Sequence, residues 1–108
     1  MANNKIYSLL GLAQRGGNLV SGGFMVENSI KDGNARLVLV AVDASANTRK
    51  EFSDMCRFRH IPMAVIGTRE ELGRAIGKEM RVSIAVTDSG LAGAIQKQIV
   101  DSINNGRE

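Results

Sequence analysis

Apolar residues near the start of the chain recur at the spacing of one helical face. Ile6, Leu9, Leu10 and Ala13 follow an i, i+3, i+4, i+7 pattern. That pattern places four side chains on the same side of an α-helix. It therefore predicts a helix over residues 3–14, with one face turned toward a core.

The rest of the chain alternates between helical spacing and short apolar runs typical of covered strands. The predicted strands cover residues 18–21, 36–42, 63–66 and 81–87, and the predicted helices cover residues 3–14, 23–32, 47–59, 68–77 and 89 onward. This alternation favours an α/β fold, a three-layer α/β/α sandwich with a small mixed, mostly parallel sheet. With 108 residues, we expect residues 1–108 to form a single domain.

Polar residues mark the starts of two predicted helices. Asn47 is the expected N-cap of the helix that ends near residue 59. Thr68 is the expected N-cap of the next helix, and Glu71 follows three residues later, which completes a capping-box pattern.

The corner formed by Ser21, Gly22 and Gly23 lies where the first predicted strand passes into a helix. The first turn of a helix has free backbone N–H groups and a partial positive charge, so it can hold a phosphate. Glycine allows a ligand to approach the backbone closely. The corner is therefore a candidate site for an anionic polymer, although a turn with a helix start explains the same residues.

Charge and composition limit the classes of function that the chain could have. The net charge is +3 and the sequence pI is about 9.4, which is compatible with a nucleic-acid partner. Aromatic residues make up 4% of the chain, which argues against a binder that stacks single-stranded bases on aromatic platforms. No apolar run approaches the ~20 residues of a membrane span. The single cysteine fits a reducing cytoplasm.

Several residues have the chemistry of catalysis or metal binding, but a structural explanation is preferred for each. Asp43, Ser45 and Asp88 follow predicted strands, where they could act as catalytic or metal-binding groups or cap the helices that follow. Cys56 and His60 have the i, i+4 spacing of half a zinc site, but no second pair exists, and Cys56 falls on an apolar stripe. We therefore expect no catalytic residues, no metal and no cofactor.

Most basic residues are scattered and are expected to form a solvated surface. Arg15 and Arg69 differ because they flank glycine turns where phosphates could bind. Both are candidate contacts for an anionic backbone.

Four collinear runs resemble one protein family. They are LLGLAQRGGNLVSG at 9–22, DGNARLVLVAVDAS at 32–45, IPMAVIGTREELGRAIG at 61–77 and VSIAVTD at 82–88. On these runs the chain resembles the L-seven-Ae superfamily of ribosomal proteins, which recognise kink-turns in RNA, and within it the small bacterial YlxQ-type branch. The resemblance implies an α/β/α sandwich that binds RNA.

The resemblance also implies where RNA would lie. One family element is the start of the second helix, with the motif G-x-N-E-x-x-K. Gly22 and Gly23 match its first two positions, but Phe24 and Met25 replace the Asn and Glu, and Asn28 replaces the Lys. In the family, Asn and Glu read the edges of sheared G·A pairs, and Lys contacts phosphate. Phe24 and Met25 cannot form such directional bonds, and each base-edge contact supplies ~1–3 kcal/mol of discrimination.

The second element implied by the resemblance is the loop before the fourth helix. Ile66, Gly67 and Thr68 match it, with Ile66 expected to pack on an extruded base and Arg69 expected to contact the RNA backbone. The resulting hypothesis is a non-enzymatic, ribosome-associated RNA-binding protein of the bacterial cytoplasm. Its expected partners are structured RNA, ribosomal or kink-turn-containing, and ribosomal proteins, and we expect a monomer that does not bind membranes.

Two alternatives remain open. The protein could be a protein-interaction module that kept the fold and lost kink-turn binding, since Phe24 and Met25 are apolar at a predicted exposed corner. An enzyme that uses Asp43 and Asp88 has the weakest support.

Overall fold

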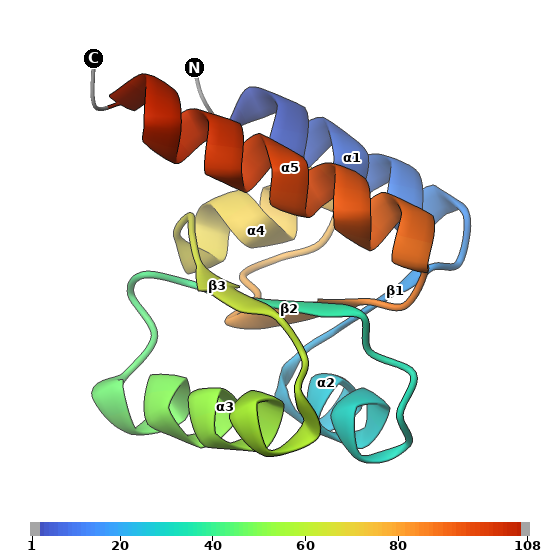
Figure 1. The fold of residues 1–108 in the computed structure, drawn as a ribbon, viewed down its shortest axis with the longest axis vertical. Coiled ribbons are helices and arrows are strands. Elements are labelled where there is room, and N and C mark those ends of the chain that lie inside the picture. The colour runs from blue at the N-terminus through green and yellow to red at the C-terminus, as the bar shows by residue number, and fades with distance from the viewer. Residues whose placement is uncertain (1–2, 107–108) are drawn as a thin grey trace.

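The computed structural model describes residues 3–106 and arranges them in three layers (Figure 1). In chain order the elements are α1 (Asn4–Arg15), β1 (Leu19–Ser21), α2 (Gly23–Lys31), β2 (Leu37–Val40), α3 (Ala46–Arg59), β3 (Met63–Val65), α4 (Arg69–Ala75), β4 (Ser83–Val86) and α5 (Ser89–Gly106). Each helix and strand predicted from the sequence is present, and every strand is shorter than predicted. Within the described residues, no helix is both long and apolar enough to cross a membrane.

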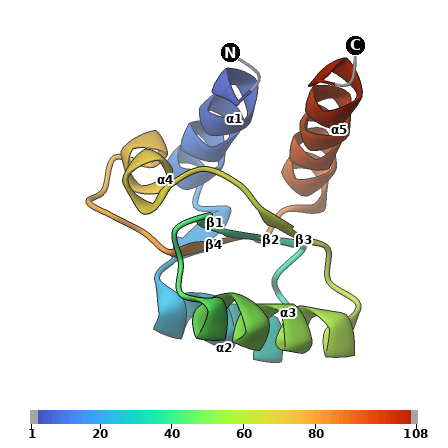
Figure 2. The same cartoon turned by 90° about the vertical axis from the view of Figure 1, so that its left-hand side faces the viewer.

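The sheet lies between two helical layers (Figure 2). Helices α1, α4 and α5 form the upper layer, and α2 and α3 form the lower layer. The three-layer α/β/α sandwich with a mixed sheet predicted from the sequence is therefore confirmed.

The strand directions differ from the expected parallel majority. The strand order is β1-β4-β2-β3. Strand β4 is antiparallel to both β1 and β2, and only β2 and β3 are parallel. The expectation of a mostly parallel sheet was wrong because β4 inserts between β1 and β2 in the reversed direction, an arrangement that helix–strand alternation does not reveal.

Both faces of the sheet are covered by apolar clusters. The upper cluster includes Ile6, Leu10, Leu72 and Ile95 from the upper helices. The lower cluster is built on Val38 and Val40 of β2 together with residues of α2 and α3. Alternate side chains of β2 point into opposite clusters, which explains why this strand is an unbroken apolar run.

The helix starts follow the expected cap chemistry with one correction. Thr68 and Glu71 form a complete capping box at α4. The N-cap of α3 is Ser45, not Asn47, because the Ser45 side chain accepts a hydrogen bond from the Thr48 backbone N–H over 3.1 Å. The N-cap of α3 therefore lies two residues earlier than the sequence pattern predicts.

Candidate functional site

Four loops meet at one edge of the sheet. The strand directions bring the ends of β1, β2 and β3 beside the beginning of β4, since Ser21 pairs with Ile84, and Val40 pairs with both Ser83 and Val65. We call this region the four-loop edge, and it comprises residues 21–24, 42–45, 66–69 and 77–82. Three of these loops run directly into helices that begin at the edge, α2, α3 and α4.

A continuous set of hydrogen bonds joins the four loops. Arg81 donates from its Nε atom to the Oγ atom of Ser21 over 3.1 Å. The Arg81 backbone N–H also donates to the carbonyl oxygen of Arg69 over 3.0 Å. Arg69 in turn donates from its backbone N–H to Oδ1 of Asp43 over 2.9 Å, and its Nε atom lies 3.4 Å from Oδ2. The loops are thus held as one surface rather than as four independent segments.

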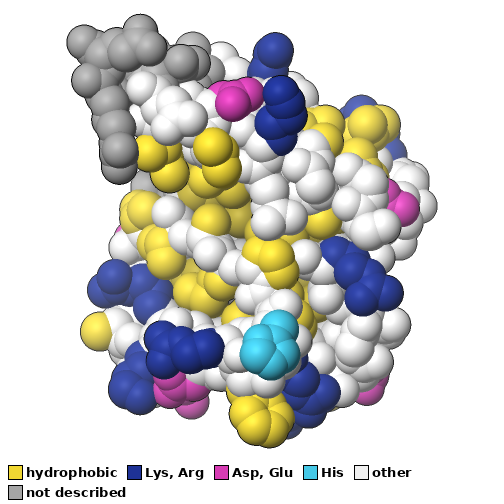
Figure 3. All heavy atoms as spheres, viewed as in Figure 1, with side chains coloured by type: hydrophobic (Ala, Val, Ile, Leu, Met, Phe, Trp, Pro, Cys, Tyr) yellow, Lys and Arg dark blue, Asp and Glu magenta, His cyan; other side chains and the backbone are white. Residues whose placement is uncertain are grey.

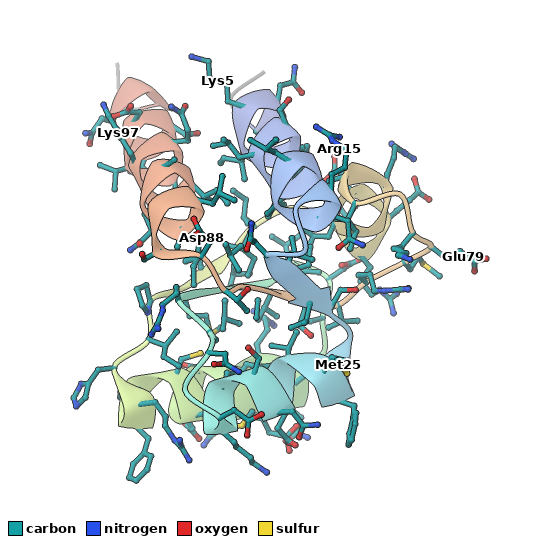
Figure 4. All side chains as sticks on the ribbon, turned by 90° about the vertical axis from the view of Figure 1, so that its right-hand side faces the viewer. Lys5, Arg15, Met25, Glu79, Asp88 and Lys97 are labelled. Carbon is teal, nitrogen blue, oxygen red and sulfur yellow. The ribbon has the colours of Figure 1, made fainter. Side chains whose placement is uncertain are left out.

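Asp43 has a structural role at this edge. The hydrogen bond from the Arg69 backbone N–H holds the pKa of the Asp43 carboxyl below its ordinary value. Asp88 instead accepts a bond from the Leu91 backbone N–H over 2.9 Å, at the other end of β4. Figure 4 shows Asp88 at the start of α5, away from Met25 and Glu79 near the four-loop edge. The two carboxylates therefore do not share a site.

Cys56 and His60 do not form a metal site. Cys56 is buried in the lower cluster, where burial raises the pKa of its thiol to about 11, whereas His60 is exposed at the end of α3. Among residues 3–106, no group of three or more His, Cys, Asp or Glu side chains could hold a metal ion.

Gly22 is the N-cap residue of α2, at the point where β1 passes into that helix. Its backbone has φ 92° and ψ 150°, a conformation that side chains with a Cβ rarely adopt. Its N–H donates to the Ser83 carbonyl oxygen over 3.0 Å, and no side chain caps α2. The first-turn N–H groups of α2, starting at the exposed Gly23, are therefore available to a ligand.

The apolar residues after Gly23 point outward. The Phe24 side chain is 76% exposed and that of Met25 is 49% exposed. Asn28, one turn later, is half-buried. The start of α2 thus presents an apolar surface to solvent.

Ile66, Gly67 and Thr68 mainly build the turn before α4. Ile66 is half-buried against the upper cluster. Gly67 has φ 71°, and a Cβ there would lie 2.6 Å from the Tyr7 hydroxyl oxygen. The Thr68 side chain is occupied by the capping box. Of the four predicted residues in this loop, Arg69 is the exposed one.

The sequence patterns missed the loop between α4 and β4, residues 77–82. Its Met80 side chain is 61% exposed. The loop is folded back against Gly73. The Gly73 carbonyl oxygen accepts a hydrogen bond from the Lys78 N–H over 2.9 Å. A Cβ at position 73 would collide with the Glu79 carbonyl group. A hollow of about 360 Å³ lies between this loop and α4. The usable signal was Gly73, a helix-interior glycine with no turn to explain it.

Arg15 is exposed at the end of α1. In Figure 4 it lies on the same side of the molecule as Glu79 and Met25. No side-chain hydrogen bond or ion pair of Arg15 occurs within the part of the chain that the structure describes, so the structure does not tie it to the four loops.

The fold and this edge define a class of protein, namely an α/β/α sandwich whose loops form one open surface. A model of the ribosomal protein L7Ae/L30e/S12e/Gadd45 family matches residues 4–95, and the chain belongs to this family.

The similar proteins agree with that assignment. The chain is 45% identical to the RNA-binding protein YlxQ of Bacillus subtilis (strain 168) over 92 residues, which cover 85% of this chain and 92% of the relative. A solved Bacillus halodurans C protein of unknown function is 41% identical with a TM-score of 0.85, covering 88% of this chain and 96% of that one. The Giardia lamblia 15.5kD RNA binding protein has a TM-score of 0.80 at 17% identity, covers 95% of this chain and 88% of its own, and supports the fold alone.

The family and the curated relative are named for ribosomal proteins and RNA binding rather than for a reaction. The chain is accordingly not an enzyme, and the hypothesis of catalysis by Asp43 and Asp88 is dropped.

Proposed function

We propose that this protein is a bacterial cytoplasmic RNA-binding protein that associates with the ribosome and holds structured RNA at the four-loop edge. The proposal rests on one observation. The start of α2 follows two glycines and has no side-chain cap, and hydrogen bonds link it through Ser21 to Arg81 and Arg69. The 45% identity to a protein named for RNA binding supports it. Ribosomal or kink-turn-containing RNA is the proposed ligand.

Phosphate contacts would come from the backbone and the arginines. The N–H groups of the first turn of α2 point away from the helix and carry its partial positive charge. Gly22 and Gly23 add no side chain that would keep a phosphate away. Arg81 and Arg69 lie beside the Gly22–Gly23 corner, because the Arg81 backbone N–H bonds the carbonyl oxygen of Arg69. Arg15 and Lys78 would add longer-range attraction for the phosphates.

Base contacts would be apolar rather than hydrogen-bonded. Phe24 and Met25 are exposed but lack the donors and acceptors that read base edges. Met80 offers a further exposed apolar surface, whereas Ile66 is partly used by the upper cluster. The proposed outcome is retained shape and backbone recognition with a weakened preference for the sheared pairs of a kink-turn.

One chain contains the whole four-loop edge. All of the hydrogen bonds that join the loops are formed within a single copy. We therefore propose that one copy occupies one RNA site, and that a monomer is sufficient for binding.

The test is a titration of fluorescently labelled structured RNAs, including a kink-turn and a ribosomal RNA fragment, at low and moderate salt. Binding that weakens as salt rises is expected, because phosphate contacts release counterions. Absence of binding to every structured RNA at low salt would overturn the proposal.

A second candidate is a protein-interaction module, favoured by the exposure of Phe24 and Met25. Pull-downs with and without nuclease separate the two functions. Partners retained after nuclease treatment favour the interaction module, and partners lost with the RNA favour RNA binding.

A further inference from the structure

Tyr7 of α1 contacts the four-loop edge from outside it. Its hydroxyl donates a hydrogen bond to Oε1 of Glu71 over 3.3 Å, although the two residues are 64 positions apart. The Tyr7 ring lies against Gly67, since a Cβ at Gly67 would be 3.5 Å from the Cε1 atom of the ring. Figure 2 shows α1 and α4 in the same layer, and the two helices pack together. Tyr7 therefore joins α1 to residues 66–69, which we call the α4 turn.

The Glu71 carboxylate that Tyr7 contacts belongs to the capping box of α4. The same oxygen atom, Oε1, accepts a hydrogen bond from the Thr68 backbone N–H over 2.9 Å. The Glu71 backbone N–H in turn donates to Oγ1 of Thr68 over 3.1 Å. Because this reciprocal pair sets where the short helix α4 starts, the orientation of the Glu71 side chain affects the position of the α4 turn.

A space beside Glu71 would allow its side chain to leave the capping box. A hollow of about 330 Å³ lies between α1 and α4, and its lining residues are Asn4, Tyr7, Glu71, Arg74 and Ala75. Arg74 lies three positions after Glu71 on α4, which is within reach of its carboxylate. The Tyr7 hydroxyl holds that carboxylate beside Thr68 instead. Without the hydroxyl, Glu71 would be free to turn toward Arg74.

The Tyr7 hydroxyl is suited to this role because it remains a donor. Burial raises the pKa of Tyr7 above its ordinary value, and the nearby Glu71 carboxylate adds to the rise. The Asn3 side chain, whose Nδ2 atom donates to the Tyr7 oxygen over 3.4 Å, acts in the opposite direction. The hydroxyl is therefore protonated at neutral pH and can donate to Glu71.

The loop between β2 and α3 holds the α4 turn at other points. The Val42 backbone N–H donates to the Gly67 carbonyl oxygen over 2.7 Å. The Arg69 backbone N–H donates to Oδ1 of Asp43 over 2.9 Å. The α4 turn is thus supported by this loop and by α1, and Tyr7 supplies the support from α1.

Surface charge alone does not direct RNA to the four-loop edge. On the face shown in Figure 3, Lys and Arg side chains are scattered among acidic and hydrophobic ones. The net charge of the chain is only +3. Phosphate binding by Arg69 therefore depends on how well the α4 turn is held, since hydrogen bonds weaken steeply when their geometry is lost.

We propose that Tyr7 is a positioning residue of the RNA-binding surface, and that its hydroxyl, acting through Glu71, holds the α4 turn so that Arg69 faces RNA. This inference rests on the proposed function, because Arg69 serves there as a phosphate contact. Tyr7 itself does not touch the RNA.

The first test is Tyr7→Phe, which removes the hydroxyl and keeps the ring. Titrations use a labelled kink-turn RNA and a labelled ribosomal RNA fragment at low salt. We expect the affinity to fall by about threefold to tenfold, as for the loss of one hydrogen bond. The control is Ser8→Ala, which removes an exposed hydroxyl from the next residue of α1 and should leave the affinity unchanged. Circular dichroism and thermal unfolding establish that both variants are folded.

A double-mutant cycle separates positioning from a general structural effect. If Tyr7 acts through Arg69, Tyr7→Phe should cause little further loss of RNA affinity in an Arg69→Ala background. In an Arg81→Ala background it should cause its full loss, because the Arg81 side chain does not contact the α4 turn. Equal losses in both backgrounds would overturn the inference.

Hydrogen exchange of the RNA-free protein, followed by NMR, tests the link between Tyr7 and the α4 turn directly. The Thr68 amide, which bonds Glu71, should exchange several-fold faster in Tyr7→Phe than in wild type, while amides of β4 keep their rates. Unchanged Thr68 exchange, or unchanged RNA affinity in Tyr7→Phe when Arg69→Ala weakens binding, would overturn the inference and leave the proposed function standing. Wild-type protein that binds neither RNA would overturn both.

Discussion

The Nε atom of Arg81 lies 3.1 Å from the Oγ atom of Ser21, although the two residues are 60 positions apart in the chain. This hydrogen bond joins the start of β4 to the end of β1 at the corner before α2. Arg81 also contacts Arg69 through the backbone, so a single residue connects three of the loops of the four-loop edge. Its guanidinium also donates from Nη1 to the carbonyl oxygen of Met80 over 3.0 Å, and no hydrogen bond of Nη2 occurs within the described residues.

Replacement of Arg81 should weaken RNA binding. We expect Arg81→Ala to lower the affinity for structured RNA by about tenfold and to make the salt dependence shallower by about one ion, as for the loss of a phosphate contact. The matched control is Arg36→Ala, since Arg36 is exposed beside the beginning of β2 and bonds the carbonyl oxygen of Gly33. Titrations at several salt concentrations measure both quantities. Equal losses for the two variants would contradict a role specific to the four-loop edge.

The backbone conformation of Gly22 should be costly for any residue with a Cβ. We expect Gly22→Ala to lower the free energy of unfolding by about 1–3 kcal/mol, because its φ of 92° is outside the regions open to alanine. Gly93→Ala is the control, since Gly93 lies inside α5 with no atom near the added Cβ. That change should be neutral or stabilise by about 0.5–1 kcal/mol. Urea unfolding compares the two variants, and equal stability of Gly22→Ala and wild type would contradict the strained turn.

Restoring the family motif should restore base readout. The relevant quantity is the affinity for a kink-turn divided by the affinity for the same RNA with its sheared pairs replaced. We expect this ratio to be about tenfold or more higher for the triple variant Phe24→Asn, Met25→Glu, Asn28→Lys than for wild type. The exposure of Phe24 and Met25 makes large stability losses unexpected. Paired titrations of the two RNAs give the ratio. An unchanged ratio in a folded variant would show that these side chains do not control kink-turn preference.

The buried thiol of Cys56 should be unreactive in the folded protein. Burial raises its pKa to about 11, so at pH 8 the reactive thiolate is scarce and inaccessible. Ellman's reagent at pH 8 should react slowly with native protein and rapidly with urea-unfolded protein. Rapid reaction of the native protein would contradict the burial of Cys56.

The same pKa shift sets the sign of a pH effect on stability. The unfolded thiol ionises near its ordinary pKa of about 8.5, whereas the folded thiol stays protonated to about pH 11. The folded state therefore binds more protons between these values, and Cys56 makes stability fall as pH rises through this window. The Cys56→Ala variant should show a weaker decline in melting temperature from pH 8 to pH 10 than wild type.

Much of the architecture was predictable because local chemistry determines it. Apolar spacing located every helix and strand, and Thr68 with Glu71 identified its helix start through a local hydrogen-bond pattern. Asn47 was the wrong cap because Ser45 and Asn47 are both good cap residues only two positions apart. The strand directions were not predictable from local patterns, since β4 lies between strands that are distant from it in sequence.

The candidate site was predicted only in part. Gly22, Gly23 and Arg69 lie in loops that meet at one edge, and Phe24 and Met25 are exposed, as the sequence predicted for that corner. Arg81 and Met80 were missed because their positions depend on the antiparallel insertion of β4, which no local pattern encodes. The polar contacts among the four loops depend on the order and direction of the strands, and no single sequence motif determines them.

The most direct measurement is an RNA titration by fluorescence anisotropy with wild type, Arg81→Ala and the control variant Phe58→Ala, using one labelled kink-turn RNA at low salt. Phe58 is 80% exposed near the end of α3 and lies outside the four-loop edge. RNA binding at the four-loop edge predicts tight binding by wild type, a loss of about tenfold for Arg81→Ala and little change for Phe58→Ala. Failure of wild-type protein to bind, or a loss for Phe58→Ala that equals the loss for Arg81→Ala, would contradict it.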